Sequence, residues 1–187
     1  LEEIGTDDQG NMIKERRNGS GATVKGVNLE FKIIPSRWMQ LQGGFTFQSS
    51  RYKNAESWSD EGDVEPTRKM LRTPDQYGYI TANITPFKKF TASLTGVYTG
   101  RMYVPHFAGY IEDNVLKHTP SFFDAGVRLA YDIKISKLIT LQVNGGVRNI
   151  FNSFQDDFDK GMDRDAGYMH RPRQPITICR GVKIGIF

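Results

Sequence analysis

The 187-residue sequence lacks most features that identify the common classes of protein. Its single cysteine, Cys179, excludes an internal disulfide and belongs to no metal-ligand spacing. No apolar run approaches the roughly 18–20 residues that a membrane-spanning helix needs. The first 20 residues are polar and contain no apolar core of a signal peptide. A helical membrane protein and a disulfide-stapled domain are therefore excluded.

The sequence also has neither a concentration of charge of one sign nor a catalytic motif. The net charge of +4 is scattered along the chain, without the basic stripe and interleaved aromatics that mark a nucleic-acid surface. There are three histidines, and no nucleophile motif of the GxSxG kind. We therefore expect no enzyme, no catalytic residues, no cofactor, no bound metal and no nucleic-acid partner.

What the sequence has in abundance is glycine, aromatic residues and alternation of apolar with polar side chains. Its 19 glycines and 12% aromatics suit strands and turns better than helices. Low mean hydropathy, −0.49, is compatible with membrane strands, because only every second residue of such a strand faces lipid. Period-two alternation predicts seven strands, in 24–34, 39–48, 80–85, 90–99, 123–132, 139–148 and 176–186.

The alternation assigns two faces to these strands. The apolar set is predicted to face outward and comprises Val27, Leu29, Phe31, Phe45, Ile80, Leu94, Val127, Leu129, Leu141 and Ile184. The polar set is predicted to face inward and comprises Asn28, Glu30, Gln42, Thr95, Arg128 and Gln142. The inward-facing charged side chains are expected to form ion pairs with one another. This charged set comprises Glu30, Lys32, Asp124, Arg128, Asp132 and Arg148.

The connections between the strands alternate in length. They are short at 35–37, 86–89 and 134–137, and long at 53–74, 105–118 and 153–174. Outer-membrane barrels have this asymmetry, with tight periplasmic turns and longer extracellular loops. We therefore predict an all-β fold, namely an antiparallel transmembrane β-barrel segment of about seven strands.

Two other interpretations stay open. A soluble β-rich binding or adhesion module also alternates apolar and polar residues, although strands of roughly 11–15 residues exceed the usual five or six. A small complete outer-membrane barrel would need an eighth strand within residues 1–20, because bacterial barrels close with an even number. A barrel enzyme would have only the acidic loop 156–165 and His170 as candidate catalytic groups.

Several motifs resemble one family, the TonB-dependent outer-membrane receptors. NGSGATVKGVN, residues 18–28, is similar to the family's N-x-G-x-A-x-x-x-G-x-E strand motif, with Ser20 in place of a glycine and Asn28 in place of the glutamate. LQVNGGVRNIFN, residues 141–152, is similar to the family's penultimate strand, which ends in an Asn-Leu-Phe-Asn-like box. Gly100-Arg101 ends a strand as in the family, and Phe187 is a terminal aromatic, one position out of phase with Ile184 and Ile186.

The resemblance implies a particular organisation. Residues 1–187 would be the C-terminal portion of a larger barrel, expected to have 22 strands, with 1–20 an extracellular loop and 21–187 barrel strands and loops. The plug domain would lie outside this chain. The intact protein would perform energy-coupled uptake of a siderophore, haem, cobalamin or other vitamin, or glycan across the bacterial outer membrane. Its partners would be that nutrient, outer-membrane lipid, and an inner-membrane energy-coupling protein reached through the missing N-terminal part.

Ligand contacts are expected in the long loops, because loops carried by a rigid scaffold are natural binding surfaces. The candidates are aromatic or imidazole side chains: Trp58, Tyr103, His106, Phe107, Tyr110, His118, Tyr168 and His170. The carboxylates of 156–165 alternate around Gly161 as in a calcium loop, but the terminal bidentate glutamate is missing. We expect Lys160 and Arg164 to neutralise them instead.

Overall fold

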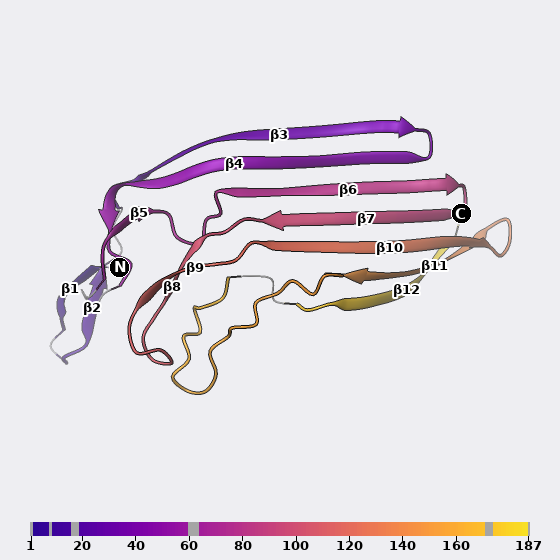
Figure 1. Ribbon diagram of the computed structural model, residues 1–187. Coiled ribbons are helices and arrows are strands. Elements are labelled where there is room, and N and C mark those ends of the chain that lie inside the picture. Colours follow the sequence, from indigo (N-terminus) through magenta and orange to yellow (C-terminus); the bar gives the residue numbers. More distant parts are fainter. Residues whose placement is uncertain (1, 8, 16–18, 60–63, 171–173, 187) are drawn as a thin grey trace.

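The computed structural model describes residues 2–7, 9–15, 19–59, 64–170 and 174–186, and this part of the chain is entirely strand, turn and loop (Figure 1). Asn18 and Phe187 of the sequence motifs lie outside the described residues. The main sheet contains β3 (Ala22–Ser36), β4 (Met39–Glu56), β5 (Thr67–Lys69), β6 (Gln76–Phe87), β7 (Phe90–Thr99), β10 (Phe122–Lys134), β11 (Ile139–Arg148) and β12 (Thr177–Ile186). Nowhere in these ranges does a helix reach the length and apolarity needed to cross a membrane.

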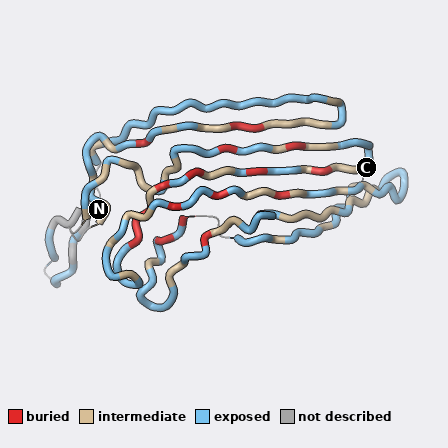
Figure 2. Tube along the Cα trace, in the orientation of Figure 1, coloured by how far each residue is buried: buried red, intermediate tan, exposed pale blue. Residues whose placement is uncertain are grey.

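The long strands form one antiparallel meander in the order β12-β11-β10-β7-β6-β4-β3, with β5 added beside β4. All seven predicted strands are present. Their connections alternate as predicted, because tight turns join β3 to β4, β6 to β7 and β10 to β11 at one end, while the long connections meet at the other (Figure 1). In Figure 2, the sheet is a single layer without a covering layer on either face.

Cross-strand register confirms which side chains share a face. Leu29 lies opposite Phe45, and Leu94 lies between Ala82 and Val127, so these apolar side chains share one face. The polar residues occupy the other face, where Asn28 lies opposite Thr46. We call these the apolar face and the polar face. The apolar face is open, with Leu29 60% and Ile184 64% exposed.

Aromatic rings on the apolar face lie over glycines of the neighbouring strand. A Cβ atom on Gly43 would be 2.9 Å from the ring of Phe31, and one on Gly78 would be 2.6 Å from the ring of Phe45. A larger residue at either position would displace the ring, so the glycines allow bulky side chains to lie flat across the sheet.

The charges of the polar face were expected to form ion pairs, and this was wrong for the described residues. Asp132 accepts a hydrogen bond from the Gln142 amide at 2.8 Å, and Arg128 donates to Asn144 at 3.1 Å. For these two charges an amide side chain of the neighbouring strand β11 supplies the hydrogen bond, so an opposite charge is not needed.

Two predicted loops contain strands. β4 continues to Glu56, and 105–118 belongs to a hairpin of β8 (Tyr103–His106) and β9 (Val115–His118). Tyr103 pairs with His118 in the same register in which Thr99 pairs with Phe122, so this hairpin extends the β7–β10 ladder beyond a break at Gly100-Arg101. Within 1–20, β1 (Glu2–Thr6) and β2 (Met12–Glu15) form a separate hairpin.

Candidate functional site

The loop end of the sheet contains the best-buried part of the molecule. Hairpin β8–β9 packs against the connection 149–176, and Met102, Val104 and Tyr168 form a small apolar cluster between them. Val104 is fully buried and Tyr168 is 1% exposed. We call this assembly the loop core.

Asn149, from the motif box, closes the base of the loop core. It adopts a left-handed backbone with φ 50°, which asparagine tolerates better than most residues. Its side-chain amide donates to the carbonyls of Ser153 (3.2 Å) and Gln174 (2.9 Å), and its Oδ1 accepts from the Ser153 N–H at 2.9 Å. Asn152, with φ 51°, accepts from the Ile176 N–H at 3.0 Å. The two asparagines therefore join the beginning of the loop to its end.

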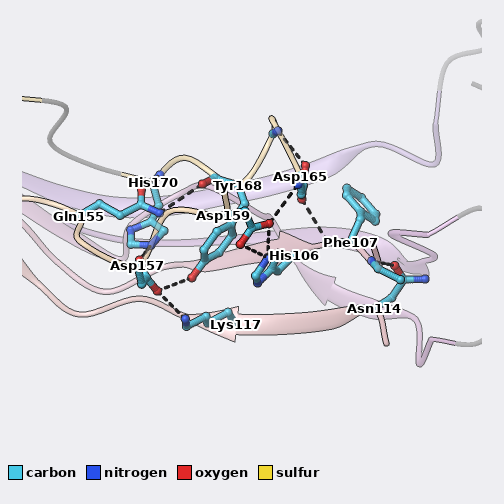
Figure 3. Close-up of polar contacts among 12 residues, drawn as sticks. His106, Phe107, Asn114, Lys117, Gln155, Asp157, Asp159, Asp165, Tyr168 and His170 are labelled. Carbon is cyan, nitrogen blue, oxygen red and sulfur yellow. Dashed lines mark hydrogen bonds and ion pairs between the residues drawn. The ribbon is translucent and has the colours of Figure 1, made fainter. Parts of the chain in front are cut away.

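His106 and Tyr168 stack at the centre of the loop core, with ring centroids 3.7 Å apart and planes at 6° (Figure 3). The His106 Nε2 lies 2.8 Å from Asp159 Oδ2, and both side chains are almost completely buried. Asp159 also accepts the Asp165 backbone N–H at 3.0 Å, so hairpin and loop are joined through one carboxylate.

Asp157 is the second junction (Figure 3). Its carboxylate accepts hydrogen bonds from the Lys117 ammonium and, at 2.8 Å, from the Tyr168 hydroxyl. Partial burial raises the pKa of Asp157, but these two hydrogen bonds outweigh it and bring that pKa to about 2. The same contact raises the pKa of Lys117, while burial raises the pKa of Tyr168.

His170 lies behind this junction and is 6% exposed. Its Nε2 is 3.4 Å from Asp157 Oδ1, while its Nδ1 is buried and has no hydrogen-bond partner among the described residues. The backbone N–H of His170 donates to Gln155 Oε1 at 2.9 Å. Burial lowers the pKa of His170, partly opposed by the Asp157 charge, so the ring is neutral at neutral pH.

Arg72 is a loop-core residue that sequence reasoning missed. It has φ 55°, and its guanidinium donates to the carbonyls of Gly167 (2.7 Å) and Met169 (2.9 Å), almost a hundred residues away. Its own N–H donates to the Tyr103 carbonyl at 2.8 Å. No local pattern marks this arginine, because both of its partners are carbonyls brought close only by the fold.

The acidic loop 156–165 was expected to be neutralised by Lys160 and Arg164, and this was wrong. Arg164 donates to the Gly161 carbonyl, while Lys117 of the hairpin pairs with Asp157 and His106 with Asp159. Asp165 accepts the Phe107 N–H at 3.1 Å. Within the described ranges, no group of three or more His, Cys, Asp or Glu side chains could hold a metal ion.

The eight predicted contact residues fall into three groups. His106, Tyr168 and His170 are buried in the loop core. Phe107 and Tyr110 are exposed at the hairpin tip. There the centroid of the Phe107 ring lies 6.2 Å from that of the partly buried Trp58. Tyr103 and His118 stack on each other with ring centroids 4.6 Å apart, and the Lys69 Nζ lies 4.2 Å from the centroid of the Tyr103 ring. The structure thus brings the candidates to one end of the sheet but leaves only some of them accessible.

Comparison with protein-family models gives no match, and neither does comparison with curated proteins. Among solved structures, the chain is similar to the closed form of the ferric-catecholate import receptor Fiu from E. coli K12, with TM-score 0.62 and 18% identity over 97% of this chain and 23% of that one. It is also similar to the siderophore receptor PiuA from Acinetobacter baumannii, with TM-score 0.61 and 17% identity over 89% of this chain and 22% of that one.

The chain therefore spans less than a quarter of either receptor. The similarity shows the fold, which is that of a stretch of receptor barrel wall with its loops. The predicted fold class and the resemblance at the level of the barrel are confirmed, and the expected outer-membrane location agrees with them.

Proposed function

We propose that this chain supplies barrel wall and ligand-facing loops to an outer-membrane receptor that imports a scarce nutrient. The observation that carries the proposal is the two-faced sheet, whose apolar face is open from β3 to β12 while polar side chains occupy the other face. A soluble protein rarely exposes an apolar patch larger than a few hundred Å². A bilayer would cover this face, and a water-filled lumen would solvate the other.

Ferric siderophores are the nutrient class we favour. Both similar receptors are named for ligands of this class: one is a ferric-catecholate import receptor and the other is a siderophore receptor. In this chain we assign ligand contact to Trp58, Phe107 and Tyr110, because they are the accessible aromatic candidates around the hairpin tip. We assign His106, Tyr168 and His170 the task of holding the loops in place, since their polar atoms and rings are engaged inside the loop core.

Energy coupling belongs to the same proposal. We propose that an inner-membrane energy-coupling protein acts through another part of the intact receptor.

The experiment is uptake of a radioactive ferric catecholate by cells carrying or lacking the whole receptor gene. We expect uptake that depends on the gene and stops when the inner-membrane proton gradient is dissipated. W58A/F107A should reduce uptake severalfold at low ligand concentration. The matched control is F87A, an exposed aromatic at the opposite, short-turn end of the sheet. Equal uptake with and without the gene would contradict the proposal for this ligand class.

A further inference from the structure

A hollow of about 510 Å³ lies where the sheet meets its loops, between β4 and the start of β6. Its lining includes four cations, Lys25, Arg51, Lys69 and Arg101, and one carboxylate, Asp75. Tyr103 and His118 form its aromatic edge. The hollow is therefore strongly positive.

Three of these cations share one side of the sheet. Lys25 lies opposite Ser49 and is two residues from Val27, which places it in phase with the apolar face. Arg51 is two residues from Ser49 and lies directly opposite Lys69 on β5. Directly opposed residues have Cβ atoms about 5 Å apart, and diagonal neighbours are about 7–8 Å apart. Three positive side chains are thus held close together on the apolar face.

Among the described residues, no ion pair neutralises these three cations. Lys25, Arg51 and Arg101 take part in no ion pair among the described residues, and the Lys69 ammonium lies over the face of the Tyr103 ring. Like charges directly opposite each other in a sheet are destabilising. An anion seated between Arg51 and Lys69 would remove that repulsion.

A second hollow, of about 440 Å³ and almost purely apolar, lies farther along the same strands on the apolar face. Val27 and Phe47 line the charged hollow, and their same-face neighbours Leu29 and Phe45 line the apolar one. From Lys25 to Phe31 the path covers six residue-to-residue steps of β3, or about 20 Å at roughly 3.3 Å per step. That length matches a charged headgroup followed by a medium-length acyl chain.

We propose that these two hollows form a binding site for a phosphate-bearing membrane lipid. Its phosphate would lie among Lys25, Arg51 and Lys69, and its acyl chain would follow Leu29, Phe45 and Phe123 toward the middle of the membrane. Charge complementarity and continuity with the apolar face select this occupant over a soluble anion, since the polar face lies on the other side of the sheet. The inference rests on the proposed membrane location of the chain, but not on the identity of the imported nutrient.

The test uses the whole receptor, purified in mild detergent, delipidated and titrated with dimyristoyl phosphatidylglycerol, with binding read by native mass spectrometry. We expect K25Q/R51Q/K69Q to weaken binding at least tenfold while the protein keeps its heat-modifiable mobility. The matched control is K32Q/R148Q/K183Q, which removes two lysines and one arginine from the polar face. That control should bind the lipid as the unaltered receptor does.

Glycerol phosphate, the headgroup without acyl chains, is the second probe and should not displace the lipid at millimolar concentration. Three results would overturn the proposal: equal weakening by both triple variants, unaltered binding by K25Q/R51Q/K69Q, or displacement by glycerol phosphate alone. Membrane location is measured separately, by carbonate extraction of cell envelopes. A receptor that stays in the extracted membrane but shows any of these results refutes the lipid site and leaves the proposed function standing.

Discussion

Asn149 shows how one side chain can define a long loop. Its left-handed backbone and its three hydrogen bonds join residues 153 and 174, so the chain between them starts and ends at one point. A buried amide that satisfies both its donor and its acceptor in this way is costly to replace. The motif box at 149–152 is therefore explained by loop closure, and its physical role is independent of the ligand.

His170 makes the loop core sensitive to pH. Burial lowers its pKa in the folded chain below the ordinary value of about 6.5, so a packed His170 resists protonation while an unfolded one accepts it. Stability from this group is present above about pH 6.5 and is lost as the pH falls below that value. The Asp157 contribution has the same sign, but it is lost only as the pH falls from the ordinary carboxyl pKa of 3.8 to the folded-state pKa of about 2.

We therefore expect hydrogen-exchange protection of 155–170 to decrease between pH 7.5 and pH 5, after correction for the intrinsic exchange rate. The strands β6 and β7 should keep their protection over the same range. H170F removes the titrating group but keeps a ring beside Phe122 and Tyr168, and it should make the decrease smaller. A decrease of equal size in H170F would contradict this explanation.

At the scale of the strand, register determines which side chains meet lipid. Adjacent residues of β3 face opposite sides, Asn28 toward Thr46 and Leu29 toward Phe45. A shift by one residue would bring every polar side chain of β3 to the apolar face. The register of β7 with β10 continues through the β8–β9 hairpin, which contributes Val104 to the buried cluster of the loop core.

Leu29→Lys and Asn28→Lys test this assignment at neighbouring positions. A lysine on the lipid side of a barrel strand costs about 2–4 kcal/mol near the bilayer midplane, whereas a lysine facing the lumen costs little. We expect L29K to lower the unfolding free energy of the whole receptor in lipid bilayers by that amount and N28K to leave it nearly unchanged. Denaturant titration followed by tryptophan fluorescence measures both. Equal losses would mean that the two faces are not in different environments.

At the scale of the whole molecule, the two edge strands of the main sheet determine whether the chain can form a barrel by itself. β3 and β12 end the meander, and among the described residues each pairs with one neighbouring strand only. The β1–β2 hairpin forms its own small sheet and does not join the two edges. Unpaired backbone groups cost on the order of several kcal/mol each in hydrocarbon.

Residues 1–187 by themselves should therefore not form a stable monomeric barrel. We expect aggregation or edge-to-edge pairing when the chain is refolded into detergent, and rescue when the rest of the receptor is supplied. Heat-modifiable gel mobility and light scattering measure the outcome. A protease-resistant, monodisperse monomer of 21.2 kDa would show that the sheet closes on itself and would restore the interpretation as a small complete barrel.

The sequence by itself determined the seven long strands, which residues of each share a face, and the alternation of short and long connections between them. These features depend on a period of two, which can be read from residues that are neighbours along the chain. It could not place the partners of Arg72, Asp157 or His106, since those contacts join segments that are distant along the chain. It also could not show that Lys25, Arg51 and Lys69 share one hollow. Periodicity records which side of a strand a residue faces, and only the folded loops and the pairing of strands decide what lies across from it.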